Sequence, residues 1–187
     1  MRKLIPVSQL SPQYMDSLRE TIEIDLKAKA ARTKGNQSGD WKVRDLLPWT
    51  DLNITSAGQA GVNTDYWGMT TLAVSTLLTY VNHKLDSDEF VAIYGVALPD
   101  VNPCVLKLLM QTGGAASTKA NYNLEEIYAS DVAIGLTPEW IYYRGDETVF
   151  IQVMPDAVGK AVGADAISDH LALIGLIATP AGEVISV

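Results

Sequence analysis

Short apolar runs recur along most of the chain, and two of them share one arrangement. Residues 91–97 read VAIYGVA and residues 171–177 read LALIGLI, each with a glycine inside and a proline soon after its end. A strand that is apolar on both sides must be covered on both faces. The two runs therefore predict a pair of central strands, each with one face on a second sheet and the other hidden by a helix, an arm or a neighbouring subunit.

Eight segments have the composition of β-strands and are separated by turn sequences rich in Gly, Pro, Asp and Asn. They are residues 51–57, 70–82, 89–98, 104–112, 122–129, 138–143, 147–154 and 170–178, and residues 183–187 are a candidate for a short ninth strand. By periodicity alone, 70–82 and 104–112 are also compatible with buried helices, although the Thr and Val content of 70–82 favours a strand. No long helical pattern lies between the strands, which argues against alternating βαβ units.

Many short strands at this spacing are typical of a sandwich or barrel, and a jelly roll explains the two similar runs. In a jelly roll one sheet has the strand order first, eighth, third, sixth, and the other has the order second, seventh, fourth, fifth. The runs at 89–98 and 170–178 are third and eighth, so they become neighbours. Gly95 and Gly175 then mark a bulge or a close backbone approach, and residues 113–120 supply the hairpin between the fourth and fifth strands.

The first part of the chain has a different pattern. Ser11-Pro12 is typical of a helix start, because serine caps a helix and proline is favoured at its first position. Apolar side chains then recur every fourth residue from Tyr14 to Leu26, and Gly35 is a natural stop. The spacing predicts a helix over about 12–34 with a narrow apolar stripe, which suits a surface or a neighbouring subunit. The predicted fold class is therefore all-β, an eight-stranded single jelly-roll sandwich with an N-terminal helical arm, divided into an arm (1–45) and a sandwich (46–187).

Charge divides the chain in the same place. Residues 1–45 carry a net charge of +3 and the remaining residues −11, for a total of −8 at pH 7. The overall negative charge argues against a general nucleic-acid-binding protein. Either the two parts meet different neighbours, or the helix simply carries solvated lysines. The basic residues that could contact a partner or line an inner surface are Arg2, Lys3, Lys27, Lys29, Arg32 and Lys34.

Cysteine content and hydropathy place further limits on the protein. Cys104 is the only cysteine, so no disulfide can form within the chain. The first ten residues contain no apolar stretch of the length found in signal peptides. The longest apolar run, residues 171–178, is far shorter than a membrane span. We therefore expect a soluble or peripheral protein.

The sequence offers few groups for catalysis or metal binding. His83 and His170 are far apart and do not form a ligand pair, whereas a cupin-type metal site needs several histidines and a glutamate. Cys104 begins a strand, where a buried structural thiol is the usual role. Asp86, Asp88 and Glu89 have calcium-binding oxygens but lack the spacing of an EF-hand loop. The expectation is no enzyme activity, no cofactor and no metal site.

Four tryptophans are scattered through the sequence, and they suggest one alternative. Trp49 and Trp140 could form a sugar-stacking platform in a lectin-like sandwich, although core or interface tryptophans are more common. An enzyme on a β scaffold, using Asp131 or His170, is a further alternative without a distinctive motif.

Three segments, in order after the helical arm, resemble a known family. They are FVAIYGVALPD, PEWIYYRGDETVFIQV and HLALIGLIATPAG. In texture and order they resemble the small single-jelly-roll major capsid proteins of tailless icosahedral viruses, especially those with an internal membrane that infect bacteria or archaea. The resemblance covers roughly residues 85–182. It implies a structural coat protein of the virion that is assembled in the host cytoplasm from copies of itself.

The resemblance also implies the partners of such a protein. A second coat protein would be one partner, and the arm would face inward or clasp a neighbour. Its basic side chains would meet lipid head groups or the genome.

Overall fold

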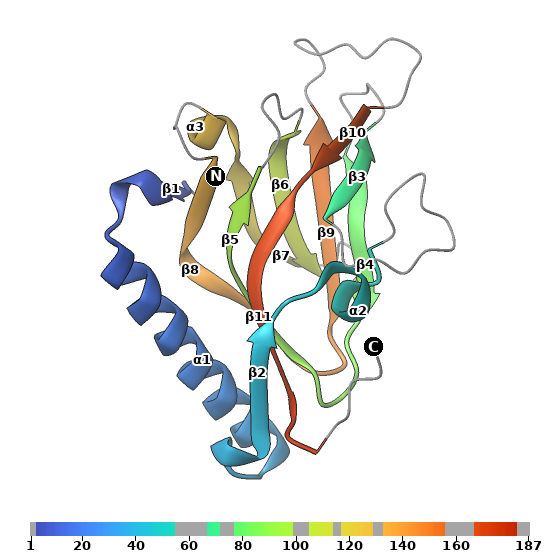
Figure 1. Cartoon of the computed structure of the whole chain (residues 1–187). Coiled ribbons are helices and arrows are strands. Elements are labelled where there is room, and N and C mark those ends of the chain that lie inside the picture. Colours follow the sequence, from blue (N-terminus) through green and yellow to red (C-terminus); the bar gives the residue numbers. More distant parts are fainter. Residues whose placement is uncertain are drawn as a thin grey trace.

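The computed structural model describes residues 3–54, 67–71, 77–98, 105–113, 117–128, 133–155 and 167–182. They form two antiparallel sheets, a two-stranded ribbon and one long helix (Figure 1). The first sheet has the order β1 (Ile5–Pro6), β8 (Ile134–Tyr143), β5 (Phe90–Ala97), β11 (Ala172–Pro180), β2 (Trp41–Asp45). The second has the order β4 (Leu78–Lys84), β9 (Thr148–Pro155), β6 (Val105–Thr112), β7 (Ser117–Asn123).

The strand order is that of a single jelly roll. Leaving aside the short β1 and the separate ribbon of β3 (Gly68–Thr71) and β10 (Ile167–His170), the eight long strands follow the predicted order in both sheets. β5 is third and β11 eighth, and the two are paired antiparallel at the centre of the first sheet. The prediction that residues 89–98 and 170–178 lie side by side is confirmed.

Each face of β5 belongs to a different apolar cluster. Val91 and Ile93 point between the sheets into the main core, and Phe90, Ala92 and Tyr94 point outward into a second cluster. The pairing with β11 skips Tyr94, so the alternation shifts by one residue and Val96 points inward again. The strand is apolar throughout because both of its faces are buried.

Gly95 and Gly175 occupy sites without room for a side chain. A Cβ on Gly175 would lie 2.8 Å from the carbonyl oxygen of Ala92, and a Cβ on Gly95 would lie 2.8 Å from Cδ2 of Leu136. Each glycine faces an isoleucine of the other strand, at the register shift. The predicted bulge and close backbone approach are therefore confirmed.

The helix α1 (Pro12–Lys34) has the predicted bounds. Ser11 accepts a hydrogen bond from the backbone N–H of Tyr14, and Gly35 ends the helix in the left-handed conformation with φ of 71°. The 3₁₀ turns η1 (Val7–Gln9) and η2 (Ser38–Asp40) flank α1. Figure 1 shows α1 in blue, running alongside the first sheet.

The first predicted strand was wrong. Residues 48–52 form the short helix α2 (Pro48–Leu52), and the first long strand is β2 (Trp41–Asp45). Proline at the first position of α2 favours the helix, and Asn53 ends it with φ of 51°. The alternation of apolar and charged residues in WKVRD was the missed signal. The remainder of the predicted segment, residues 55–57, lies outside the described residues.

Three other strand predictions needed correction. The segment 70–82 contributes to two strands in different sheets, β3 and β4, and residues 72–76 lie outside the described residues. The fifth long strand is residues 117–123 rather than 122–129, and α3 (Glu125–Tyr128) follows it. The last predicted strand is divided between β10 and β11. The possible ninth strand, residues 183–187, also lies outside the described residues.

The predicted division between arm and sandwich at residue 45 stays a prediction. Residues 41–45 of the arm as predicted are paired with β11 in the first sheet.

Candidate functional site

The outward face of the first sheet is covered by the chain's own helix. Ile22, Leu26 and Ala30 of α1 are at most 1% exposed. They belong to one apolar cluster with sheet residues that lie on the outward face, which are Trp41, Phe90, Ala92, Tyr94, Leu136, Leu176 and Ala178. Trp41 meets Phe90 edge-on, with ring centroids 5.2 Å apart. The expected cover for the doubly apolar strands is therefore α1.

Polar contacts fix the second half of α1 to β8. The indole N–H of Trp140 donates to Asp25 at 2.9 Å, and Lys29 pairs with the same carboxylate at 2.6 Å. The Lys29 ammonium also lies 4.9 Å from the centre of the Tyr142 ring. Burial raises the pKa of Tyr142 to about 12. Lys29 is therefore held against the chain's own sheet.

The first half of α1 has a weaker polar anchor. Arg19 pairs with Asp45 of β2 at 2.5 Å, but their side chains are 45% and 66% exposed. Exposed pairs of this kind contribute about 0–1 kcal/mol. Apolar burial is therefore the main attachment of α1 to the sheet.

The structure distinguishes two groups among the six predicted arm residues. Lys27 pairs with Glu23 at 2.7 Å and Lys29 with Asp25, so both are neutralised within the helix. Arg32 and Lys34 are exposed in the last turn, and neither contacts a carboxylate among the described residues. Lys3 is exposed near β1, and Arg2 lies outside the described residues. The basic group open to a partner is thus smaller than the sequence suggested.

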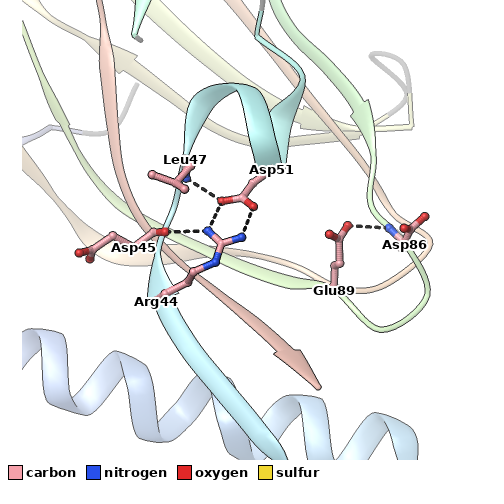
Figure 2. A network of polar contacts seen from close by, with 6 residues as sticks. All are labelled: Arg44, Asp45, Leu47, Asp51, Asp86 and Glu89. Carbon is pink, nitrogen blue, oxygen red and sulfur yellow. Dashed lines mark hydrogen bonds and ion pairs between the residues drawn. The ribbon is translucent and has the colours of Figure 1, made fainter. Parts of the chain in front are cut away.

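A buried ion pair closes the corner after β2 (Figure 2). Arg44 donates two hydrogen bonds to Asp51, at 2.7 and 2.5 Å, and Asp51 is only 1% exposed. The same carboxylate accepts the backbone N–H of Leu47 at 2.6 Å, which fixes the start of α2. The fork of arginine matches a carboxylate in this geometry. The ion pair therefore stabilises the corner between β2 and α2. The sequence did not predict it, because Arg44 lies in the predicted arm and Asp51 in a predicted strand.

Figure 2 also shows one part of the candidate calcium ligands. Glu89 accepts the backbone N–H of Asp86 at 2.9 Å, so its carboxylate stabilises the turn before β5. Within the described ranges, no three His, Cys, Asp or Glu side chains gather as metal ligands would. The acidic group is explained by turn formation.

A second polar network lies at one end of the sandwich. Lys119 of β7 pairs with Glu147 at 2.8 Å and donates to the carbonyl oxygen of Tyr142 at 2.5 Å. Its ammonium lies 4.5 Å from the centre of the Tyr143 ring. Burial alone would raise the pKa of Glu147, but the hydrogen bonds from Lys119 and the Arg144 backbone hold it below its usual value. The network ties the two sheets together, and no sequence spacing reveals it.

The predicted histidines are not brought together. His83 is on β4 of the second sheet, and His170 ends β10 in the separate ribbon. Burial lowers the pKa of His83, and Asp86 and Asp51 partly oppose that effect. Cys104, the other candidate, lies outside the described residues.

The tryptophans of the lectin alternative are also apart. Trp140 is on β8 and interacts with Asp25 and Lys29, whereas Trp49 is on α2, which follows β2. β5 and β11 separate β8 from β2, which places those strands about 14 Å apart at 4.8 Å per strand. Trp140 is therefore held in contacts with α1, which does not suit a sugar-stacking platform.

Comparison with known proteins gives little further information. No family model matches the sequence, and no curated protein matches it. Among solved structures, the chain is similar to the crystal structure of the infectious bursal disease virus VP2 subviral particle, with a TM-score of 0.36 and 10% identity over 75% of this chain. It is also similar to a structure of the Gx strain of that virus, with a TM-score of 0.34 and 14% identity over 77% of this chain. The chain spans about a third of the length of each, 32% and 34%. Similarity at this level does not establish a shared function.

Proposed function

We propose that this chain is a structural coat protein of a virus, which associates with copies of itself into a closed shell. The observation that carries the proposal is the strand order of a single jelly roll, the architecture used by viral coat domains, lectins and cupins. The sequence resemblance to small capsid proteins of tailless icosahedral viruses favours the first of these three. The finer assignment, to viruses with an internal membrane and to assembly in the host cytoplasm, is part of the same proposal.

The other two jelly-roll classes are less well supported. A cupin would need a cluster of metal ligands, and the two histidines lie in different sheets. A lectin-like module would use exposed aromatic rings, but Trp41 is 3% exposed and Trp140 is engaged with α1. Ligand binding at another surface remains the second candidate, favoured only by the half-buried Trp49 and Trp67.

The arm would act in two ways in a shell. Its apolar face covers the outward side of the first sheet, so each copy would be fully folded before it assembles. Its exposed Arg32 and Lys34, with Lys3 and Arg2, would face anionic lipid head groups or the genome, at about 1 kcal/mol per basic residue near an anionic surface. Among the described residues, none of the helices combines the length and apolar character needed to cross a bilayer.

Sedimentation of the purified full chain over a range of concentrations tests the proposal. A coat protein will show a cooperative transition from small species to one large particle of uniform size, because closed symmetry fixes the copy number. A chain that stays monomeric at the highest soluble concentration, and that binds an oligosaccharide in a fluorescence titration, would support the ligand-binding alternative instead. If a second coat protein is required, large particles will form only after that protein is added.

A further inference from the structure

The solvent-facing side of α1 carries a second pattern that the fold does not use. Ser17, Thr21, Ile24 and Ala28 are all exposed, on the side of the helix opposite the buried Ile22 and Leu26. Ile24 is 62% exposed, the most exposed large apolar side chain among the described residues. A partner that covered Ile24 would bury this apolar side chain, and burial of apolar surface favours association at about 25 cal/mol per Å².

The spacing of these four residues is that of a helix–helix seam. They follow one another at intervals of four, three and four residues, which is the spacing of a and d positions over two heptads, with Ile24 and Ala28 as the apolar members. Three of them are small, so a partner backbone could approach closely. The hydroxyls of Ser17 and Thr21 already donate within the helix, to the carbonyl oxygens of Tyr14 and Ser17 at 3.0 and 2.7 Å. Because those groups are satisfied internally, burying this face leaves no hydroxyl donor without an acceptor.

Charge along the helix selects one orientation for the partner. The first half of α1 carries a net charge of −2, from Asp16, Arg19, Glu20 and Glu23, and the second half carries +3, from Asp25, Lys27, Lys29, Arg32 and Lys34. A second copy of the same helix running in the opposite direction would place its basic half against the acidic half of the first. A parallel copy would place like charges together.

Two charged positions on the same side of the seam are especially informative. Glu20 and Lys27 border Ile24 at equivalent heptad positions, seven residues apart. In an antiparallel pair centred between Thr21 and Ile24, Glu20 of each copy faces Lys27 of the other, and both contacts follow from one two-fold axis. Lys27 would then share its ammonium between this contact and the intrahelical Glu23.

We propose that two copies of this chain associate through their α1 helices, packed antiparallel along Ser17, Thr21, Ile24 and Ala28 about a two-fold axis. The inference goes beyond the proposed coat function, since it names the surface and the symmetry of one contact. It holds for the dimer in solution as well as within any larger assembly. The opposite face of α1 stays on the first sheet of its own chain, so the pairing needs no rearrangement of the fold.

The first test is the strength of the dimer in the full chain, measured by sedimentation velocity at concentrations below particle formation. Ile24→Asp should raise the dimer dissociation constant at least about tenfold, because the seam would bury two carboxylates without partners. Leu77→Asp is the matched control, since Leu77 is an exposed apolar residue at 45% exposure that lies before β4. It should leave the dimer unchanged, and equal weakening by both variants, or by neither, would overturn the proposal.

Charge exchange provides a test that does not depend on Ile24. Glu20→Lys and Lys27→Glu should each weaken the dimer, and the double variant should restore it, because the two cross-helix pairs are then rebuilt with reversed sign. In a Cys104→Ser background, a mixture of Ser17→Cys and Ala28→Cys chains should cross-link as a heterodimer, and Ser17→Cys alone should not. Cross-linking of Ser17→Cys with itself would indicate a parallel pair and contradict the proposal.

Vesicles of phosphatidylglycerol distinguish a lipid-facing helix from a paired one. If the wild-type chain stays monomeric but sediments with these vesicles, and Ile24→Asp abolishes that binding, the exposed face of α1 is a membrane contact and the proposal is wrong. If Ile24→Asp abolishes the dimer but shells still form normally, the α1 pairing is a contact of the free dimer that the shell does not need. The proposed coat function would then stand. Absence of shells in the wild type, with the dimer intact, would contradict the coat function alone.

Discussion

Gly175 occupies a position where backbone atoms of β5 leave no space for a Cβ. The nearest atom, the carbonyl oxygen of Ala92, would be 2.8 Å away, and backbone cannot rotate aside as a side chain can. We expect Gly175→Ala to destabilise the fold by about 1–3 kcal/mol, as overpacking of a tight core does. Gly39→Ala is the matched control, because nothing lies within 4 Å of its Cβ position. Urea denaturation measures both, and equal stabilities would show that β5 and β11 are not in this register.

Asp51 is the most deeply buried carboxylate of the described residues, and Arg44 is its partner. Removing one member of a buried pair leaves the other charge uncompensated and costs about 3–5 kcal/mol. Arg44 keeps 28% exposure and so some access to water, which places Asp51→Asn at the lower end, about 3 kcal/mol. Asp45→Asn removes the exposed pair with Arg19 and should cost no more than about 1 kcal/mol. Similar losses for the two variants in chemical denaturation would contradict the account of this corner.

His83 gives the fold a dependence on pH near neutrality. Burial lowers its pKa in the folded state below the ordinary value of 6.5, so folding favours the neutral imidazole. Its contribution to stability is complete above pH 6.5 and is lost as pH falls from there through the folded pKa. We expect the free energy of unfolding to decline in that interval, and His83→Gln to flatten the decline. An identical slope in the variant would assign the pH dependence to other groups.

At the scale of elements, the attachment of α1 to the first sheet is the feature on which the rest depends. Leu26 is 1% exposed against the sheet, and Ile24, two residues earlier, is 62% exposed. We expect Leu26→Ala to cost about 2–5 kcal/mol and Ile24→Ala less than about 0.5 kcal/mol in the monomeric chain. Thermal unfolding followed by tryptophan fluorescence measures the difference. A small effect of Leu26→Ala would mean that α1 is detached from its own sheet in solution.

Elements with strong local signals could be predicted from the sequence. The helix over 12–34 has a serine cap, a proline at its first position and a glycine stop, and its bounds were predicted correctly. The central strands 89–98 and 170–178 were recognisable because both faces are apolar, and the strand order followed from the topology. The signals for the helix and for the two central strands lie in consecutive residues.

Elements that depend on distant partners were not predictable in the same way. Residues 51–57 have a strand-like composition, but Pro48 and the Arg44–Asp51 pair favour a helix at 48–52. Of the candidate arm residues, Lys29 forms an ion pair with Asp25. The same carboxylate accepts a hydrogen bond from Trp140, which is 115 positions away along the chain. Spacing cannot show such contacts, because they exist only once β8 and α1 are packed together.

For the whole molecule, we expect charge to determine how the proposed association depends on salt. The sandwich part carries a net charge of −11, which keeps separate copies apart at low ionic strength. Salt screens this repulsion and leaves apolar contacts in place, so we expect assembly to strengthen as ionic strength rises. Light scattering at a fixed protein concentration, with increasing sodium chloride, measures the effect. Dissolution of the particles by salt would show instead that ion pairs hold them together.

Cryo-electron microscopy of the purified full chain, under conditions that favour association, tests the central claim most directly. The account predicts closed particles built from repeated jelly rolls, with α1 of each copy lying on its own first sheet over Phe90 and Leu176. Isolated single copies at every concentration, or particles in which α1 has left its sheet and that surface faces water, would contradict it.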